Sequence, residues 1–336
     1  MKAVICQEPN RLGVMERPAP QPAPGEVLIR IRRVGLCGTD YHIFAGRHPF
    51  LAYPRVMGHE LAGEIVSAPA GSTLRLGQTV AVNPYLACGQ CIACRKGKPN
   101  ACVNICVLGV HADGGMCELL AVPEHAVIDA TGLSLDQAAM IEFLAIGMHA
   151  VTRANLESGS RVLVVGAGPI GVAVGLFARL RGASVALADT RPARLAYARD
   201  QLGFADVIEA APDMLDTVRD VTDGELFDAV FDATGALPAM ARSLDFVAHG
   251  GTLVLVGVAQ GDLVLSDPEF HKRETTLLAT RNALNQDFEQ VISAIKQGQI
   301  PTGALHTHSL PALELPDRLP WLIAEADQVL KAIAHF

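Results

Sequence analysis

A glycine-rich hexapeptide constrains the fold of this chain more than any other feature. It directly follows an apolar run at residues 162–165 and opens an expected helix over residues 171–180. A bare G-x-G-x-x-G motif carries little weight, but here the required strand precedes it and the helix follows it. The first glycine makes a tight turn, the second lets backbone approach a pyrophosphate, and the third permits close helix–strand packing. The motif consists of Gly166, Ala167, Gly168, Pro169, Ile170 and Gly171.

The same motif predicts a dinucleotide site. The phosphates would lie at the helix N-terminus, where free N–H groups and the helix dipole favour an anion. Asp189 ends the next expected strand, and its carboxylate can accept from both ribose hydroxyls of NAD while repelling the 2′-phosphate of NADP. We therefore expect NAD as the cofactor. Arg191 and Arg194 leave NADP open, because an arginine near that ribose tolerates the phosphate, although we place Arg194 along the adenine side.

Two patterns divide the chain into domains. Up to about residue 126, Gly and Pro interrupt short β-rich runs, which is typical of a barrel-like β domain. From about residue 135, apolar runs alternate with helical segments, which predicts βαβ units, a parallel sheet and an α/β fold. We predict one domain from residues 1–146 and 285–336, and a nucleotide-binding domain from residues 147–284. The clearest expected strands are residues 26–34, 61–67, 78–82, 161–165, 184–188, 228–232 and 251–257, and the clearest further helices are residues 191–201 and 286–296.

Composition narrows the possible functions. The chain has 336 residues, with 27 Lys and Arg against 35 Asp and Glu and a formal net charge of −8. This acid excess argues against nucleic acid as a partner, because a protein that binds phosphate backbones presents a basic surface. The sequence reaches Glu8 before any apolar stretch of signal-peptide length, and its longest uncharged run, residues 162–178, falls short of a membrane helix. We expect a cytoplasmic protein without a membrane partner.

Four cysteines at close spacing predict a structural metal site. Cys88, Cys91, Cys94 and Cys102 follow the pattern C-x2-C-x2-C-x7-C. Their thiolates can surround one Zn²⁺ tetrahedrally and leave no open position for a substrate. An iron–sulfur cluster is the alternative, since three cysteines two residues apart are also cluster spacing. Zinc is favoured because Val103, not a proline, follows the last cysteine.

A second group of potential ligands has a mixed composition. Cys37 supplies a thiol, and the adjacent His59 and Glu60 supply an imidazole and a carboxylate from a separate segment. Three protein ligands of this kind leave a fourth position on zinc for water or a substrate oxygen. Each residue alone is a weak signal, and a lone Cys37 would be a buried core thiol more often than a ligand. Together they predict a catalytic zinc site.

In combination these motifs resemble the zinc-containing medium-chain alcohol and polyol dehydrogenases. The segments G-L-C-G-T-D-Y-H at residues 35–42, G-H-E-L-A-G-E-I at 58–65, the four cysteines and V-L-V-V-G-A-G-P-I-G at 162–171 occur in the order of that family, over essentially the whole chain. The resemblance is to the sorbitol and threonine dehydrogenase branch. It is closer still to bacterial enzymes that oxidise L-galactonate or L-gulonate at carbon 5, on residues 107–115, 266–272 and 280–283.

The resemblance implies a GroES-like β-rich catalytic domain with a Rossmann doubly wound domain, and one catalytic and one structural Zn²⁺. It makes Cys37, His59 and Glu60 ligands of the catalytic zinc, and Glu142 a further acid that either ligates the zinc or holds its water. Phe143 stands where the family usually has proline. The catalytic group is expected to include Glu142 and a proton relay through Thr39 and His42.

The substrate residues implied by the resemblance are His111 and Arg281. A guanidinium fork fits a carboxylate with two hydrogen bonds, so Arg281 favours a sugar acid over a neutral polyol. The expected partners are a small sugar acid or polyol and further copies of the chain, as a homodimer or homotetramer. A neutral polyol or threonine-type dehydrogenase is the main alternative. A non-enzymatic NAD-binding regulator and a zinc-free quinone-type reductase fit less well, because Cys37, His59 and the four cysteines are all present.

Overall fold

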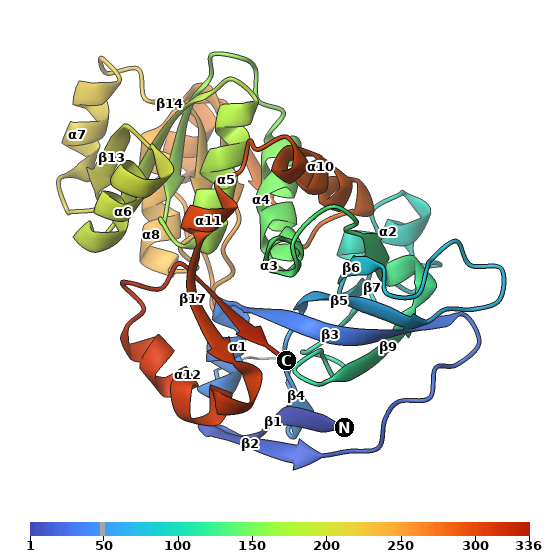
Figure 1. The fold of residues 1–336 in the computed structure, drawn as a ribbon. Helices are drawn as coiled ribbons and strands as arrows, with labels where there is room; N and C mark the ends of the chain where they lie inside the picture. Colours follow the sequence, from blue (N-terminus) through green and yellow to red (C-terminus); the bar gives the residue numbers. More distant parts are fainter. Residues whose placement is uncertain (48–50) are drawn as a thin grey trace. The chain divides into compact units, whose positions relative to one another are not determined.

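The computed structural model describes residues 1–47 and 51–336, and the contacts within the chain separate two units. Unit 1 contains Met1–Glu142 and Ala283–Phe336, and unit 2 contains Phe143–Asn282. Figure 1 shows the consequence within unit 1, where the blue start and the red end of the chain contribute to one sheet. Among the described residues, no helix combines the length and the apolar composition that crossing a bilayer requires.

The main sheet of unit 1 has seven strands. Its order is β10, β6, β5, β3, β18, β17, and β9 pairs with the long strand β3. All neighbours are antiparallel except β17 and β18, which are parallel. The bounds are β3 (Glu26–Leu36), β5 (Glu60–Ser67), β6 (Thr79–Val82), β9 (Leu119–Pro123), β10 (Val127–Asp129), β17 (His306–Pro311) and β18 (Lys331–His335).

Strand β3 explains how this sheet supports the site. Val27, Ile29 and Ile31 are buried at alternate positions, which is the period of a strand with one face on a core. A register shift follows Ile31, and the strand then ends in three consecutive buried residues. At that end Gly35 pairs with Glu60 of β5, and Leu36 pairs with Ala332 of β18. Three strands from distant parts of the sequence therefore meet just before Cys37.

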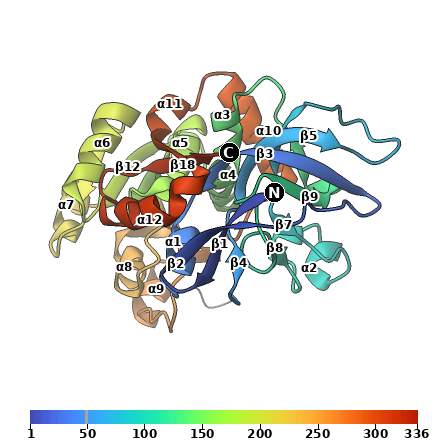
Figure 2. The same cartoon turned by 60° about the horizontal axis from the view of Figure 1, so that its bottom comes forward.

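Smaller elements complete unit 1. Figure 2 shows β1, β2 and β4 together, and β1 pairs with both of the others. The helix α10 buries Phe288, Val291, Ile292 and Ile295, which lie on one helical face. The bounds are β1 (Lys2–Glu8), β2 (Arg11–Glu16), β4 (Arg55–Val56), β7 (Tyr85–Leu86), β8 (Cys106–Val107), α1 (Gly38–Phe44), α2 (Ile92–Arg95), η1 (Pro99–Ala101), η2 (Glu124–Ala126), α3 (Leu135–Ala139), α10 (Asn285–Lys296), α11 (Thr302–Leu305), η4 (Ala312–Glu314) and α12 (Leu315–Ala324).

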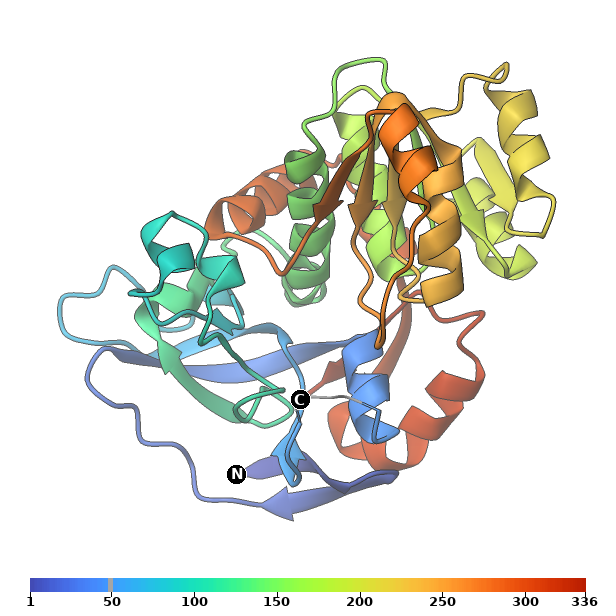
Figure 3. The same ribbon diagram turned by 180° about the vertical axis from the view of Figure 1, so that it is seen from behind.

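Unit 2 is built on a parallel sheet of six strands in the order β13, β12, β11, β14, β15, β16. Counted within the unit this is 3-2-1-4-5-6, the order of a dinucleotide-binding doubly wound fold. Helices lie on both faces of the sheet (Figure 3). The bounds are α4 (Ile141–Ala154, which begins in unit 1), β11 (Arg161–Val165), α5 (Pro169–Leu180), β12 (Ser184–Asp189), α6 (Pro192–Leu202), β13 (Asp206–Glu209), α7 (Met214–Val221), β14 (Phe227–Asp232), α8 (Leu237–Arg242), η3 (Ser243–Phe246), β15 (Val247–Leu255), α9 (Asp267–Lys272) and β16 (Thr276–Ala279).

The predicted parallel sheet and alternating helices are confirmed, with small differences at element ends. Helix α5 begins at Pro169, two residues before the predicted start, because proline is favoured in the first turn of a helix. Strand β15 begins at Val247 rather than residue 251 and ends at Leu255. Two glycines in its middle, Gly250 and Gly251, hid the first half of the strand from the sequence pattern.

Candidate metal centres and nucleotide site

The four predicted cysteines converge on one point in unit 1. Their sulfur atoms all lie within 4.8 Å of one another. The Sγ of Cys91 is 3.5 Å from that of Cys94 and 3.8 Å from that of Cys102. A tetrahedral Zn²⁺ with Zn–S bonds of about 2.3 Å holds its sulfurs roughly 3.8 Å apart. The spacing fits a single zinc ion and is too tight for a cluster of several irons between the same sulfurs.

The loop that carries these cysteines has little core of its own. Helix α2 buries none of its residues, and Ile92 and Val103 are 56% and 70% exposed. Backbone groups instead stabilise the sulfurs, since hydrogen bonds from the N–H groups of Cys94 and Val103 lower the pKa of the Cys91 thiol to about 6. A thiolate is the form that binds a metal. A metal bound by the four cysteines would therefore replace the apolar packing that this lobe lacks.

The second cluster begins with Cys37, which caps helix α1. Its Sγ accepts a hydrogen bond from the backbone N–H of Thr39, and its own N–H donates to Oδ2 of Asp40 at 3.0 Å. Oδ1 of Asp40 accepts from the N–H of Gly58, just before His59. Asp40 is 0% exposed, and burial raises the pKa of its carboxyl. Asp40 thus connects the segments that deliver Cys37 and His59.

Three buried side chains complete this cluster. The ligand atoms of His59, Glu60 and Glu142 lie within 4.8 Å of one another, and His59 also groups with Cys37 and Asp40. Within the described part of the chain, Nδ1 of His59 and Oε2 of Glu142 are buried without a hydrogen-bond partner. Each such group costs about 1–3 kcal/mol unless something satisfies it. A thiol, an imidazole and a carboxylate with two unsatisfied atoms fit a zinc ion.

The electrostatics of the cluster agree with a cation site. Burial raises the pKa of the Glu142 carboxyl to about 7, against the lowering effect of His59. Burial alone would lower the pKa of His59, but the nearby Cys37 thiol, Asp40 and Glu142 raise it well above its usual value. Without a metal, the site therefore attracts protons to compensate for its negative charge. A divalent cation supplies the same compensation.

Two further residues contact the acids of this cluster. The Tyr85 hydroxyl donates to Oε1 of Glu142, and burial followed by the Glu142 charge raises the pKa of Tyr85 well above its usual value. The Lys331 ammonium lies 2.7 Å from Glu60 Oε1 and 2.7 Å from Oε2. Sequence reasoning missed Asp40, Tyr85 and Lys331. Asp40 had a local signal, the spacing of a helix-capping box after Cys37, whereas the other two contacts join residues far apart in the chain.

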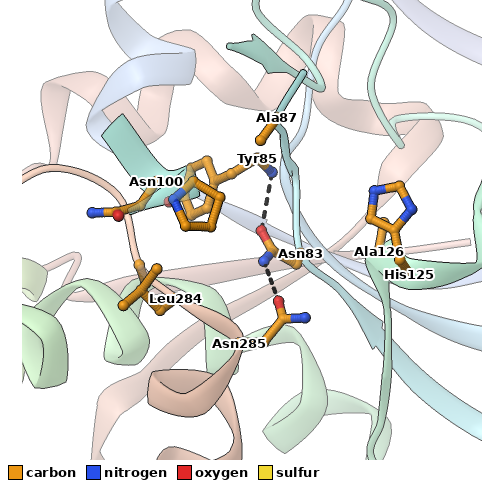
Figure 4. Close-up of a pocket in the computed structure, with 10 residues that line it drawn as sticks. Asn83, Tyr85, Ala87, Asn100, His125, Ala126, Leu284 and Asn285 are labelled. Atoms are coloured by element: carbon orange, nitrogen blue, oxygen red, sulfur yellow. Dashed lines mark hydrogen bonds between the residues drawn. The ribbon is translucent and has the colours of Figure 1, made fainter. Parts of the chain in front are cut away.

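A cavity of about 200 Å³ lies within unit 1 next to Tyr85. Figure 4 shows Asn83 and Asn285 pointing toward one another, and Nδ2 of Asn83 donates to Oδ1 of Asn285 at 2.6 Å. The N–H of Tyr85 donates to Oδ1 of Asn83. Tyr85 therefore borders both the cavity and the metal cluster. The lining residues are Asn83, Tyr85, Ala87, Pro99, Asn100, His125, Ala126, Ala283, Leu284 and Asn285, and neither His111 nor Arg281 is among them.

The proposed relay residues lie on α1. Thr39 is half-buried and His42 is exposed, three residues apart and so on the same face of the helix. Partial burial and the charge of Arg47 lower the pKa of His42, which favours the neutral form of its imidazole. His111 and Arg281 are both exposed, in unit 1 and unit 2 respectively. Nδ1 of His111 accepts a hydrogen bond from the N–H of Val107.

In unit 2 the glycine-rich motif forms the predicted turn between β11 and α5. Gly166 has φ of +102°, and a Cβ on Gly171 would lie 1.7 Å from the Gly166 carbonyl oxygen, so only glycine fits either position. Asp189 ends β12, and its two carboxylate oxygens accept from the N–H groups of Ala167 and Arg191. The guanidinium of Arg194 approaches Gly168. The structure thus brings Asp189 and Arg194 to the motif.

Comparison with known proteins identifies the family. One family model, the alcohol dehydrogenase GroES-like domain, matches residues 23–132, and a second, the zinc-binding dehydrogenase, matches residues 169–297. The chain is 42% identical over its whole length to an L-galactonate-5-dehydrogenase of Escherichia coli K12, of which it covers 99%. The chain belongs to the zinc-binding alcohol dehydrogenases. The predicted GroES-like and Rossmann domains, the enzyme class, and zinc and NAD as cofactors are confirmed at the level of this family.

Other relatives support the same assignment. The chain is 32% identical to a D-altritol 5-dehydrogenase of Agrobacterium fabrum, with 94% of each chain covered. A solved alcohol dehydrogenase, rspB of Escherichia coli CFT073 complexed with NADH, superposes with a TM-score of 0.94 at 29% identity and covers 100% of this chain and 99% of its own. The chain is therefore a zinc-binding dehydrogenase, and its relatives include enzymes named for a sugar acid and for a polyol.

Proposed function

We propose that this zinc-binding alcohol dehydrogenase oxidises a secondary alcohol of a sugar acid, of the L-galactonate or L-gulonate type, to the ketone with NAD. The observation that carries the proposal is the full-length identity of 42% to an L-galactonate-5-dehydrogenase, against 32% to a relative that acts on the neutral polyol D-altritol. The expectations of a homodimer or homotetramer and of a cytoplasmic location remain part of this proposal.

The proposed catalytic metal site uses Cys37 and His59 together with the acids Glu60 and Glu142. When bound, zinc supplies Lewis-acid chemistry that lowers the pKa of a hydroxyl group, and NAD accepts the hydride. Cys37 directly after β3, His59 directly before β5 and Glu142 in the first turn of α4 would hold the ion. A second zinc is assigned to Cys88, Cys91, Cys94 and Cys102.

The proton released from the alcohol needs a route out of this buried site. His59, Glu60 and Glu142 are at most 5% exposed, so solvent does not reach them directly. The half-buried Thr39 hydroxyl would pass the proton along α1, and His42, whose pKa is lowered by partial burial and by the charge of Arg47, would accept it at the exposed end. We propose these two residues as the relay.

For the cofactor, we propose NAD bound at Gly166, Gly168, Pro169, Ile170 and Gly171, with Asp189 on the ribose. Both carboxylate oxygens of Asp189 already accept one backbone hydrogen bond each, which holds the side chain in one orientation, and each oxygen keeps a further lone pair for a ribose hydroxyl. The relative solved with NADH supports this choice. Replacing Asp189 by Ala should narrow the preference for NAD over NADP, measured as the ratio of kcat/KM for the two cofactors.

Substrate recognition is proposed to involve Arg281 and His111. The chain carries a formal net charge of −8, and such a field repels an anionic sugar acid. An exposed arginine such as Arg281 provides local positive charge and a two-pronged hydrogen-bond donor for a carboxylate. Arg281→Ala should therefore raise KM for a sugar acid at least tenfold and barely change KM for the matching neutral polyol. Arg219→Ala, at an exposed arginine on α7, is the matched control.

The proposal is tested by measuring NAD reduction by the zinc-loaded enzyme. The substrates compared are hexonates, the corresponding hexitols and threonine. We expect L-galactonate or L-gulonate to give the highest kcat/KM. A hexitol or threonine with a higher kcat/KM would replace the sugar-acid proposal by the polyol or threonine-type alternative. Equal effects of Arg281→Ala on the acid and on the polyol would refute a carboxylate contact at that residue.

A further inference from the structure

The cavity beside Tyr85 is built from three separate segments of unit 1. Its lining residues lie within residues 83–100, 125–126 and 283–285. Its volume of about 200 Å³ would hold roughly six or seven water molecules at about 30 Å³ each. The same space takes a chain of about three carbon atoms with their hydroxyl groups. The cavity is therefore too small for a whole six-carbon sugar acid and large enough for part of one.

The polar groups that line this cavity carry no fixed charge. They include three primary amides, and none of the described lining residues is an acid, a lysine or an arginine. A carboxylate held here would lack a counter-charge, which is costly. An amide offers both donors and an acceptor, so it matches a hydroxyl group, which also donates and accepts. The lining therefore fits the hydroxyl groups of a sugar acid rather than its carboxylate. The amides belong to Asn83, Asn100 and Asn285.

The orientation of the Asn83 side chain is fixed by its neighbours. Its Oδ1 accepts from the backbone N–H of Tyr85 at 3.0 Å, and a backbone N–H can only donate. The amide nitrogen of Asn83 must therefore face Asn285, whose Oδ1 accepts at 2.6 Å (Figure 4). Among the contacts of the described residues, this pair uses one amide N–H bond and leaves the others for a ligand. The two amides are thus pre-oriented, which lowers the cost of binding.

Tyr85 connects this cavity with the mixed metal cluster. It lines the cavity, and its hydroxyl donates to Oε1 of Glu142. The ligand atoms of Glu142, His59 and Glu60 form part of that cluster. One tyrosine therefore spans the distance between the two places, because its backbone N–H contacts Asn83 and its hydroxyl contacts Glu142. A carbon chain that lies along this tyrosine reaches from the metal cluster to the cavity.

We propose that Asn83 and Asn285 form a subsite for the hydroxyl groups of the substrate chain, at the end of Tyr85 opposite the metal cluster. The subsite favours substrates whose chain continues with hydroxyl groups beyond the reacting carbon. Sugar acids and hexitols share such a chain, so both use the subsite. It differs in this from Arg281, which is proposed to contact only the carboxylate. The inference rests on the proposed oxidation of a sugar acid and assigns a further part of that substrate.

The test uses the full-length, zinc-loaded enzyme with L-galactonate as the substrate and the corresponding hexitol as a second substrate or as a competitive inhibitor. Asn285→Ala is the main variant, because Asn285 is exposed and its replacement should not disturb the fold. Asn83→Leu removes the buried amide with little change of size. Gln286→Ala is the matched control, since Gln286 follows Asn285 in α10 and does not line the cavity. Melting temperatures check that each variant is folded.

Asn285→Ala should raise KM for L-galactonate at least about tenfold, because the substrate loses hydrogen bonds to its hydroxyl groups. The KM or inhibition constant of the hexitol should rise by the same factor. Both kcat and KM for NAD should stay within about threefold, since the subsite contacts neither the reacting carbon nor the cofactor. Asn83→Leu should have the larger effect, because it also removes the group that orients Asn285. Gln286→Ala should change none of these values.

Two results would overturn the inference while the proposed function stands. One is an unchanged KM for L-galactonate in Asn285→Ala, and this variant decides the question even if Asn83→Leu does not fold. The other is a higher KM for L-galactonate without any change for the hexitol, because the cavity would then contact the carboxylate. A wild-type enzyme that oxidises no hexonate would refute the proposed function, and the inference with it.

Discussion

The two candidate metal-binding clusters of unit 1 are assembled by opposite routes. The four-cysteine cluster takes all its sulfurs from a short exposed segment, Cys88–Cys102, in which α2 buries no residue. The mixed cluster collects Cys37, His59 and Glu142 from three segments, and its histidine and acids are buried. A local cluster needs its metal to hold the segment together. Strand pairing assembles the mixed cluster without a metal. A metal bound there is therefore not needed for stability and is available for catalysis.

The largest effect on activity is expected at the mixed cluster. Cys37→Ser should lower kcat at least about 1,000-fold, which corresponds to roughly 4 kcal/mol of lost transition-state stabilisation. The fold should survive, because a serine oxygen can accept the N–H of Thr39 that the sulfur now accepts and is a favoured helix cap. Turnover and circular dichroism of the purified variant check both parts. An active variant without metal at this cluster would contradict the division of roles.

The largest effect on stability is expected at the four-cysteine cluster. Cys91→Ser removes a sulfur that lies close to two others, so its zinc should be lost and the surrounding loop should unfold. We expect the free energy of unfolding to fall by more than about 4 kcal/mol, measured by denaturant titration. The fraction that stays folded should keep its catalytic zinc. If Cys91→Ser were as stable as the wild type, the structural assignment would be wrong.

A smaller effect is expected for the residue that orients the mixed cluster. Asp40→Asn keeps the shape of a side chain that accepts from Cys37 and Gly58 but removes its charge from beside His59. Such partners of metal ligands typically contribute 10- to 100-fold in metal affinity. We expect zinc affinity, measured by competition with a chelator, to fall within that range. An unchanged affinity would show that Asp40 serves only as a helix cap.

The smallest effect is expected at Cys106, which follows the four-cysteine segment but belongs to none of the metal-binding groups among the described residues. Cys106→Ser should keep two zinc ions per chain, and kcat and stability should stay within about twofold and 0.5 kcal/mol of the wild type. Metal analysis of the purified variant checks this. Loss of a zinc would mean that Cys106, not Cys102, is the fourth ligand of the four-cysteine cluster.

Local signals explain which parts of the molecule could be predicted from the sequence. The glycine motif before α5 and the alternation of strands and helices predicted the parallel sheet of unit 2, because each signal spans only a few neighbouring residues. The four-cysteine cluster was predictable for the same reason, because its ligands lie close together in the sequence. The site at Cys37 and His59 had a weaker signal, because neither residue is distinctive alone and the prediction depended on their combination with Glu60 and on the resemblance to a family.

The missed residues depend on contacts that no local pattern encodes. Lys331 reaches Glu60 across 271 positions of the sequence, and Tyr85 reaches Glu142 across 57. In the sequence Lys331 is only one basic residue at the start of an apolar run. Their roles follow from the pairing of β3 with β5 and β18, which sets distant side chains against one another.

The measurement that tests the account most directly is zinc content followed together with activity during partial removal of the metal. The account predicts two zinc ions per chain, a first ion whose loss to a chelator abolishes NAD reduction while the fold persists, and a second whose loss coincides with unfolding of the loop at residues 88–102. Mild chelation should therefore leave an inactive, folded protein with one zinc that regains activity when zinc returns. A single zinc per chain in the active enzyme, or full turnover after the first ion has been removed, would contradict it.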